Sequence, residues 1–472
     1  MKSVTFRHGI HPADGKALSA DMPIRLVAPV PGGESVYPLS QHIGAPAVPV
    51  VSVGDHVSAG QLIAQAGSFV SAPVYASASG TVTSLCPRTT SSGETAPCVV
   101  IHNDEVNEWI DPAFDPAGAG AYDPAFPLSC RIDAARLTPD AIRKAVREAG
   151  IVGLGGAGFP AAVKLAPKDP DKIDHLIING AECEPYLTSD YRLMLERGEA
   201  LIAGCRFLLH LFPNADCRIC IEDNKPEAIR HMDALIRKTD DTRLSVVPLR
   251  AKYPQGGERM LIGAVTGRRL NSAMLPADVG CVVMNAASVV ACFYAIAQGR
   301  PLTHRIMTVT GDGVKSPCNL EVPIGISYRD VLAAAGGFAG KPEKVITGGP
   351  MMGTALYTLD IPVTKTSASI LALAKDPVAL HDTTPCVHCG KCLRACPENL
   401  VPQLLSQAAD RGEFDVFEKY GGMECIECGS CAYVCPAKRH LVQSMRYGKR
   451  QTGAIIRARK AAEAARKGGT DK

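Results

Sequence analysis

Short apolar runs separated by turn residues characterise the N-terminal part of the chain. Between Gly44 and Val82 these runs alternate with Gly, Pro, Asp and Ser, which is the spacing of short strands in a small β sandwich or barrel. Helical periodicity appears later, with apolar residues at 142, 145, 146 and 149. It follows Thr138-Pro139-Asp140, in which Pro takes the first position of a helix. The pattern therefore predicts a β domain followed by a helix.

Strands and helices alternate through the rest of the chain. His175–Asn179 and Ile306–Gly311 read as strands, whereas Tyr328–Ala335 and Val401–Tyr420 read as helices. The stretch from Val279 to Gln298 holds 20 residues without a charge, which is long enough to span a bilayer. Because it is rich in Ala and interrupted by polar residues, we predict a buried strand followed by a helix instead.

Composition narrows the class of protein. A chain of 472 residues is long enough for several domains with their own cores. The net charge of +3 gives no reason to expect nucleic acid binding, and the charges between Met1 and Asp21 argue against a signal peptide. Eighteen cysteines point to a reducing compartment. We expect the close pair Cys217-x2-Cys220 to be buried in a strand rather than redox-active.

Two cysteine runs of identical spacing lie near the C-terminal end. They read Cys386-x2-Cys389-x2-Cys392-x3-Cys396-Pro397 and Cys425-x2-Cys428-x2-Cys431-x3-Cys435-Pro436. In runs of this kind the first three thiolates bind one cluster, and the last Cys reaches the other cluster. We therefore assign one [4Fe–4S] cluster to Cys386, Cys389, Cys392 and Cys435, and the second to Cys425, Cys428, Cys431 and Cys396. Disulfides or zinc fit this spacing poorly, because zinc needs two ligand pairs around one ion.

A glycine-rich segment, Gly153-Leu-Gly-Gly-Ala-Gly158-Phe-Pro160, follows the first predicted helix. It formally satisfies G-x-G-x-x-G, but the dinucleotide fingerprint needs a strand before it, and a helix precedes it here. Its backbone N–H groups could still approach a phosphate or a ring closely, and Lys164 could neutralise a phosphate. The strand at 175–179 runs into Glu182 and Glu184, and ligands of α/β domains bind at such strand ends. From spacing alone, a surface turn beside solvated acids remains the alternative.

Longer motifs resemble known families. "GGAGFP", Asn179-x2-Glu182-x-Glu184 and Tyr253-x2-Gly256-x-Glu258 resemble the flavin- and NADH-binding subunit of respiratory complex I. In their order, "FRHGIHP", "GLGGAGFP", "NGAECEPYLTSDYRLM", "YPQGGE", "VTGDGVKSP", "ITGGPMMG" and the cysteine runs resemble the C subunits of Rnf (Rsx) ion-translocating electron-transport complexes. "VGDHVSAGQLIA" and "APVYASASGTV" resemble the biotinyl/lipoyl barrel-sandwich fold. Tyr75, Ala76 and Ser77 replace the modified Lys of that fold, so we expect a packing module rather than a swinging arm.

These resemblances imply an α/β multidomain fold. Its parts are an N-terminal β barrel-sandwich hybrid, an α/β FMN/NADH-binding domain, an SLBB-like β-grasp domain and a C-terminal α-helical ferredoxin-like domain with two [4Fe–4S] clusters. The basic tail is expected to be solvated and disordered, or else an arm that touches anionic lipid or an acidic partner. The expected boundaries are 1–103, a linker at 104–135, then 136–300, 301–365, 366–448 and the tail at 449–472.

The resemblance also implies which residues bind the cofactors. FMN would be held by residues of the glycine loop and of the two strand ends, namely Gly155, Gly156, Gly158, Lys164, Asn179, Glu182 and Asn285. The nicotinamide nucleotide NAD(H) would face Phe159, Glu184 and Glu258. Two positions depart from the complex I pattern, since Ala181 stands where that protein has Asp and Gly257 where it has Glu.

The function implied is that of a ferredoxin:NAD+ oxidoreductase subunit. FMN accepts a hydride and releases single electrons, which reconciles NADH with one-electron clusters. The partners implied are integral membrane subunits, a ferredoxin-like iron–sulfur subunit and, indirectly, ferredoxin; the location is the cytoplasmic side of the cell membrane, peripherally. Two alternatives remain: a cluster-only relay subunit without flavin, which Ala181 and Gly257 would favour, and a soluble NADH-dependent reductase or diaphorase subunit.

Overall fold

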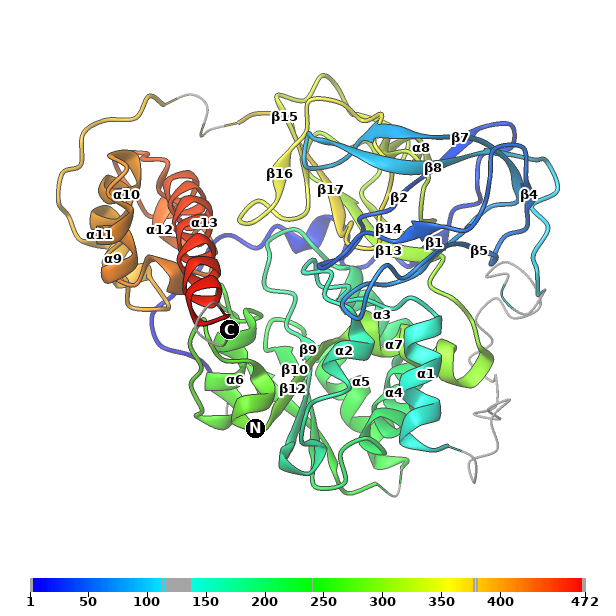
Figure 1. Cartoon of the computed structure of the whole chain (residues 1–472), viewed down its shortest axis with the longest axis horizontal. Coiled ribbons are helices and arrows are strands. Elements are labelled where there is room, and N and C mark those ends of the chain that lie inside the picture. Colours follow the sequence, from blue (N-terminus) through cyan, green and yellow to red (C-terminus); the bar gives the residue numbers. More distant parts are fainter. Residues whose placement is uncertain are drawn as a thin grey trace. The chain divides into compact units, whose positions relative to one another are not determined.

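The computed structural model describes residues 3–111, 114, 137–239, 241–376, 378 and 381–468, without the side chains of 464–468 (Figure 1). Most of the predicted linker at 104–135 lies outside these residues. The chain divides into two compact units. The first comprises Met1–Val4, Ala13–Arg250 and Pro276–Lys375, and the second Thr5–Pro12, Ala251–Leu275 and Asp376–Lys472.

The first unit begins with a barrel-sandwich of two antiparallel sheets, ordered β2-β8-β7-β4 and β3-β5-β6. Apolar side chains such as Val57, Ile63 and Val82 are fully buried between them. Strand β6 and the loop after it pack on neighbouring domains, because the Tyr75 hydroxyl donates to the Glu148 carbonyl and the Ser77 hydroxyl to the Ile324 carbonyl. The predicted packing role is therefore supported. The strands are β2 (Glu34–Pro38), β3 (Val48–Pro49), β4 (His56–Val57), β5 (Leu62–Gln65), β6 (Val74–Tyr75), β7 (Gly80–Thr89) and β8 (Thr95–Asn103).

A parallel four-stranded sheet, ordered β11-β10-β9-β12, forms the middle of the first unit. Its strands are largely buried, as expected of a parallel sheet covered by helices. The elements are α1 (Pro139–Glu148), α2 (Ala161–Lys164), β9 (His175–Gly180), α3 (Ser189–Glu196), α4 (Gly198–Leu209), β10 (Asp216–Glu222), α5 (Pro226–Arg237), β11 (Leu244–Leu249), β12 (Cys281–Asn285) and α7 (Ala286–Gln298).

Several local predictions for this sheet are confirmed. Thr138 caps α1, since its hydroxyl accepts a hydrogen bond from the backbone N–H of Ala141. The uncharged stretch at 279–298 forms β12 and α7. Cys217 and Cys220 are both buried in β10, where burial raises the pKa of each thiol.

A six-stranded sheet, ordered β1-β14-β13-β17-β15-β16, completes the first unit. The predicted strand at 306–311 and the predicted helix at 328–335 are both present. Because β17 pairs with β13 and β15, we propose that this domain extends beyond 365. Its elements are β1 (Ile24–Leu26), β13 (His304–Thr310), β14 (Cys318–Pro323), α8 (Tyr328–Ala334), β15 (Lys344–Thr347), β16 (Thr354–Ala355) and β17 (Ser369–Leu373).

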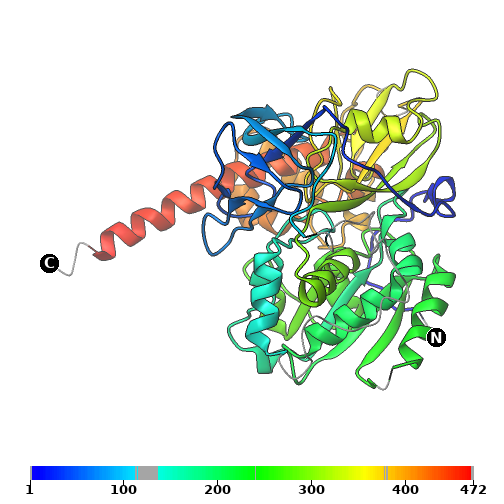
Figure 2. The same cartoon turned by 90° about the vertical axis from the view of Figure 1, so that its right-hand side faces the viewer.

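The second unit is helical around the cysteine runs. The single helix predicted over 401–420 is wrong: the chain forms two helices, α10 and α11, because Gly412 adopts a left-handed φ of 75° between them. The disorder expected for the tail is also wrong over 449–468, since α13 continues to Gly468 (Figure 2), and residues 469–472 lie outside the described part. The helices are α6 (Glu258–Thr266), α9 (Lys391–Ala395), α10 (Pro402–Asp410), α11 (Phe414–Lys419), α12 (Ser430–Tyr433) and α13 (Leu441–Gly468).

A helix that spans a membrane needs both sufficient length and sufficient hydropathy. None of the helices in the described part of the chain combines the length and the apolarity needed to cross a bilayer.

Candidate functional site

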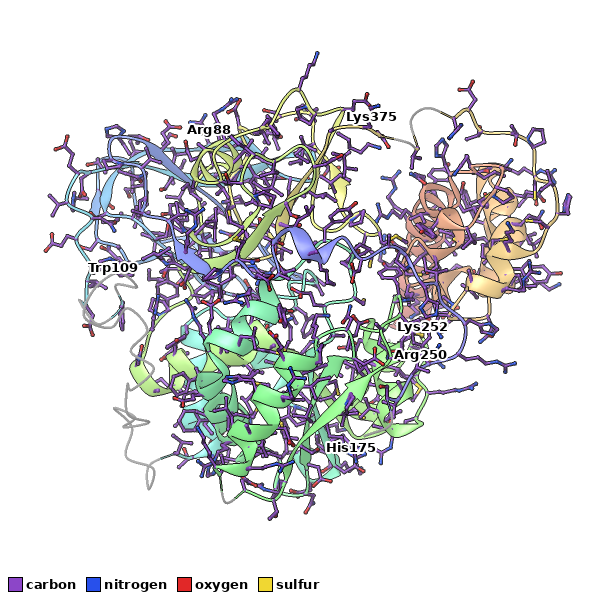
Figure 3. All side chains as sticks on the ribbon, turned by 180° about the vertical axis from the view of Figure 1, so that it is seen from behind. Arg88, Trp109, His175, Arg250, Lys252 and Lys375 are labelled. Atoms are coloured by element: carbon purple, nitrogen blue, oxygen red, sulfur yellow. The ribbon has the colours of Figure 1, made fainter. Side chains whose placement is uncertain are left out.

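The parallel sheet of the first unit has a topological switch point at β9. The chain passes from β9 to β10 on one side and later returns to β12 on the other. Asn179 and Asn285 are register partners at the carboxyl ends of β9 and β12, whereas His175, labelled in Figure 3, opens β9 at the amino edge. Open α/β sheets bind ligands in the crevice at such carboxyl ends. The two predicted asparagines therefore meet where a ligand is expected.

The glycine loop lies beside this crevice and is held there by Ser288. The Ser288 hydroxyl accepts a hydrogen bond from Leu154 N (2.8 Å) and donates to the Val152 carbonyl (3.2 Å). Within the loop, Gly158 N donates to the Gly153 carbonyl over 3.0 Å. The loop is thus fixed at its base by a fully buried side chain from α7, which the sequence interpretation missed.

Glycine is needed at three positions of this loop for different structural reasons. A Cβ at Gly155 would lie 3.4 Å from Asn285 Cβ, so this glycine packs directly on the strand end. Gly156 has φ +101° with open space around it, and Gly158 has φ +64° with Thr366 Cγ2 only 2.7 Å from where a Cβ would be. The loop therefore presents exposed backbone at Gly155 and Gly156 and cannot accept a side chain at Gly158 without movement.

Two further predicted residues flank the loop. Phe159 is half-buried beside Gly158. Lys164 ends α2, and its ammonium group donates to the Val283 carbonyl in β12 over 3.3 Å. Lys164 therefore reaches β12 two residues before Asn285.

Asn285 connects the crevice to a half-buried acid. Its Oδ1 accepts hydrogen bonds from Ala287 N (3.0 Å) and Ser288 N (3.3 Å), which caps α7. Its Nδ2 donates to Asp190 Oδ2 over 2.7 Å. Burial raises the pKa of Asp190, and the neighbouring Arg305 opposes this rise. Asp190 was not predicted as a site residue, although it lies in the "SDYRLM" motif.

Glu182 points its carboxylate at the start of α3. It accepts hydrogen bonds from Asp190 N (2.7 Å) and Tyr191 N (3.3 Å), two of the backbone donors that a helix N-terminus leaves without a partner. Its backbone is in the left-handed region, with φ 49°. Burial raises the pKa of Glu182 to about 7, while Lys16 and Lys225 act in the opposite direction. Glu182 therefore ties the loop after β9 to the start of α3.

A buried lysine from the N-terminal segment holds the same loop. Lys16 Nζ donates to the carbonyls of Glu182 (2.9 Å), Glu184 (2.9 Å) and Leu187 (2.5 Å). Lys225 Nζ donates to the Ala181 carbonyl over 2.7 Å. Both ammonium groups are buried among acids. The position where Ala181 replaces Asp is thus fixed through its backbone.

Glu184 lies against the six-stranded sheet rather than free in the crevice. Its carboxylate accepts hydrogen bonds from Met351 N (3.1 Å) and Met352 N (2.8 Å), in the "GGPMMG" motif. A Cβ at Gly349 would lie 2.1 Å from Glu184 Oε2, so that glycine is needed for the approach. Burial raises the pKa of Glu184 to about 7.

Glu258, the last predicted nucleotide-binding residue, is the first residue of α6 and belongs to the second unit. The "YPQGGE" motif that precedes α6 contacts the cysteine region of that unit. The fully buried Tyr253 donates from its hydroxyl to the Cys428 carbonyl over 2.7 Å. Arg259 pairs with Glu424 (2.9 Å) and Glu398 (3.3 Å).

The four cysteines assigned to the second cluster line one pocket of the second unit. They come from both runs and are Cys396, Cys425, Cys428 and Cys431. No three His, Cys, Asp or Glu side chains of the described residues converge closely enough to hold a single metal ion. Four thiols lining one pocket is the donor set that a [4Fe–4S] cluster takes.

The residues assigned to the first cluster also come from both runs. Thr384 N, just before Cys386, donates to the Ala437 carbonyl, just after Cys435, over 3.1 Å. The short helices α9 and α12, which contain the third cysteines Cys392 and Cys431, contact each other. The structure therefore brings the start of the first run to the end of the second, as the crossed assignment requires.

Comparisons with known proteins agree with this arrangement. Family models match in four places: the RnfC barrel sandwich hybrid domain at 4–106, the Nuo51 FMN-binding domain at 146–293, the SLBB domain at 306–355 and the 4Fe-4S dicluster domain at 379–445. The predicted fold class is thereby confirmed. A crystal structure of an NAD+-reducing [NiFe]-hydrogenase in the air-oxidized state has a TM-score of 0.48 and 27% identity, covering 60% of this chain and 54% of that one.

Full-length relatives are more similar. The C subunit of the proton-translocating ferredoxin:NAD(+) oxidoreductase complex of Clostridium ljungdahlii is 43% identical over 459 residues, 97% of this chain and 96% of the relative. The C subunit of the Na(+)-translocating ferredoxin:NAD(+) oxidoreductase complex of Acetobacterium woodii is 42% identical over 456 residues, 96% of this chain and 98% of the relative. This chain therefore belongs to the RnfC family, the C subunits of ion-translocating oxidoreductase complexes.

Proposed function

We propose that the switch-point crevice of the first unit binds FMN and that the two crossed cysteine sets of the second unit bind [4Fe–4S] clusters. As a member of its family, the chain is a subunit of an ion-translocating ferredoxin:NAD+ oxidoreductase complex. The observation that carries the residue-level proposal is the meeting of the glycine loop, Asn179 and Asn285 at the carboxyl edge of β9 and β12.

The crevice suits a flavin phosphate and ring. The exposed backbone of Gly155 and Gly156 lets a flat ligand approach closely, and a side chain at either position would fill that space. Lys164 supplies a positive charge for the phosphate, and Asn285 lies beside Gly155. When bound, FMN accepts a hydride from NADH and passes its electrons on singly.

The chain's own residues fix the shape of the nucleotide side. Lys16 holds the carbonyls of Glu182 and Glu184, so the loop between them keeps its left-handed turn. Phe159 borders the glycine loop and would stack on the nicotinamide. The carboxylate of Glu184 binds the backbone at Met351 and Met352, so we propose that it orders this wall of the site. Assignment of Glu258 to the nucleotide stays a prediction from the family resemblance.

Two sets of thiols suit iron–sulfur clusters. The second set is the more enclosed, with Cys396 and Cys428 buried. Backbone N–H groups already point at sulfur, as for Leu400 N and Cys396 Sγ at 3.4 Å. Hydrogen bonds of this kind tune the reduction potential of a bound cluster. The crossed ligand sets make each cluster depend on both runs.

The proposed place of this chain is the cytoplasmic face of the cell membrane, as a peripheral subunit. Its free thiolates and its substrate NAD(H) suit a reducing compartment. Integral membrane subunits would supply the path for the ion, and a ferredoxin-like iron–sulfur subunit would exchange electrons with this chain.

Flavin binding tests the crevice directly. FMN titrated into the purified full-length protein should bind one equivalent, and Lys164→Met should raise the Kd by about tenfold, equivalent to about 1.4 kcal/mol. The exposed Lys168 on the same segment provides the control, since Lys168→Met should leave the Kd unchanged. Equal affinities in all three proteins would show that Lys164 does not bind the phosphate of FMN. Absence of FMN binding in the unmodified protein would favour a cluster-only relay.

A further inference from the structure

The two cysteine runs repeat in sequence but differ in charge. Residues 386–395 and 435–440 surround the first cluster site and carry four cations and no acid: Lys391, Arg394, Lys438 and Arg439. Residues 425–434, which supply three ligands of the second site, carry Glu427 and no base. Glu427 is neutralised within the unit by Lys449 (2.9 Å) and Arg446 (3.3 Å), so the two copies of the motif differ in local charge.

The second run is covered by another segment of its own unit. Tyr253 donates to the Cys428 carbonyl, and a Cβ at Gly257 would lie 3.9 Å from Ile426 Cδ1. Arg259 pairs with Glu424 nearby. The covering segment is the "YPQGGE" motif, which the family resemblance assigns to the nucleotide. The second cluster site therefore lies on the side of the nicotinamide motif.

In the described part of the chain the first run is more exposed, with Gly9 N donating to the Ala395 carbonyl near its end over 3.3 Å. Cys389 is the only one of the eight ligand cysteines that is exposed. The apolar side chains next to it are also open to solvent, with Val387 64% and Leu393 45% exposed. An exposed cluster ligand between apolar side chains is what a contact for electron exchange requires.

Exposed basic side chains occur in both runs. Lys391 opens α9 and is exposed; Lys438 follows Cys435 and is exposed as well. The backbone bond from Thr384 to Ala437 places these two segments side by side. Among the described residues neither Lys391 nor Lys438 has an acidic partner within salt-bridge distance, whereas Arg439 pairs with Asp410 at 3.6 Å. We name Val387, Cys389, Lys391, Leu393, Arg394 and Lys438 the open cluster face.

We propose that the open cluster face docks an acidic one-electron carrier protein, and that electrons are exchanged with the rest of the complex here rather than at the second run. An apolar centre with a basic rim is the composition of a protein–protein contact, and the rim charges would steer an acidic partner and set its orientation. The inference rests on the proposed function, because that function supplies NAD(H) as the other end of the electron path. Each reduced carrier gives up one electron and leaves oxidised. Two such electrons, together with one proton, convert NAD+ to NADH.

Charge reversal tests the face. The probe is an acidic two-cluster [4Fe–4S] ferredoxin reduced with titanium(III) citrate, mixed with the cluster-loaded full-length protein in a stopped-flow instrument without NADH. Lys391→Glu with Lys438→Glu should slow the second-order reduction of the protein by about tenfold at low salt, and weaken its salt dependence. The neutral pair Lys391→Gln and Lys438→Gln should fall between.

A matched control separates this face from net charge. Arg457 and Lys460 are exposed on α13, and reversing both produces the same change in total charge. We expect that control to react like the unmodified protein. An equal slowing in the control, or no slowing in the variant with reversed Lys391 and Lys438, would overturn the proposal. Iron content confirms that each variant keeps its clusters.

A second readout separates this inference from the function on which it rests. NADH-dependent reduction of ferricyanide, a small acceptor, should be unchanged in the variant with reversed Lys391 and Lys438. Normal ferricyanide activity with an unaltered ferredoxin rate would refute the face and leave the function intact. No NADH oxidation in the unmodified protein would refute the NADH function, and the stopped-flow rates would still decide the face.

Discussion

Replacing Lys16 with Met should loosen the loop that carries Glu182 and Glu184. Lys16 Nζ donates three hydrogen bonds to backbone carbonyls, including that of Leu187 at 2.5 Å. A hydrogen bond with a charged partner contributes about 1.5–3 kcal/mol, so three contribute roughly 5–9 kcal/mol. Burial of the ammonium group costs several kcal/mol and offsets part of this. A net loss of about 2–4 kcal/mol remains for Met at this position.

That loss should appear in FMN affinity, because the loop borders the crevice. If half of the lost stabilisation, about 1–2 kcal/mol, is subtracted from the binding free energy of FMN, the Kd rises by about 5- to 30-fold, since 1.4 kcal/mol is tenfold. Fluorescence titration of FMN measures the Kd in the full-length protein. Lys341→Met is the control, because Lys341 is an exposed lysine of the same unit.

The second unit provides an internal reference for the Lys16→Met variant, because its clusters report whether an effect is confined to the first unit. Lys16 belongs to the first unit, so iron content should remain that of the unmodified protein. An FMN Kd within twofold of the unmodified value, with normal iron content, would refute the reasoning. Lys16 would then be a buried residue without influence on the flavin site.

Three further substitutions have definite expected outcomes. Gly158→Ala should weaken FMN binding more than tenfold, because Cβ would meet Thr366 Cγ2 at 2.7 Å in a left-handed backbone. Glu184→Gln should flatten the pH dependence of the temperature at which bound FMN is released. Burial raises the pKa of Glu184 from 4.5 to about 7, so the folded state binds more protons in that interval and its stability falls as pH rises from about 5 to 7. Cys396→Ala should remove about four of eight irons and leave the same spectrum as Cys428→Ala.

Each of these expectations has its own control. Gly156→Ala meets no atom within 4 Å but shares a positive φ (+101°) with Gly158, so it is the control for backbone strain, and the extra loss in Gly158→Ala reports the contact with Thr366. For the acid, an unchanged pH slope in Glu184→Gln would contradict burial as the cause. For the clusters, Cys389→Ala should match Cys435→Ala and differ from Cys396→Ala. A spectrum of Cys396→Ala that matches Cys389→Ala would contradict the crossed assignment.

Local sequence was sufficient wherever the determining contacts are local. The cysteine spacing defines cluster ligands because a short loop brings the sulfurs together, and the structure gathers Cys396 with the second run. The strand and helix at 279–298 followed from apolarity and length. The helix predicted over 401–420 failed at Gly412, where a left-handed residue ends one helix and apolar periodicity continues beyond it.

Residues that act over long sequence separations were missed. Lys16 contacts a loop 166–171 positions away, and nothing in its local pattern distinguishes it from a solvated lysine. Ser288 fixes Leu154 across 134 positions, although its place three residues after Asn285 was a usable capping signal. Glu184 was predicted to face the nucleotide, yet its oxygens bind the "GGPMMG" loop. In the sequence, this close approach of Glu184 to the loop is indicated by the glycine pair Gly348-Gly349.

The central claim is that one chain carries electrons between NADH and two clusters through FMN. The most direct measurement counts flavin and iron in the anaerobically reconstituted full-length protein and then follows absorbance after NADH is added. About one FMN and about eight irons, with bleaching of both the flavin and the clusters, are expected. About eight irons with no flavin and no response to NADH would contradict the claim and leave a cluster relay.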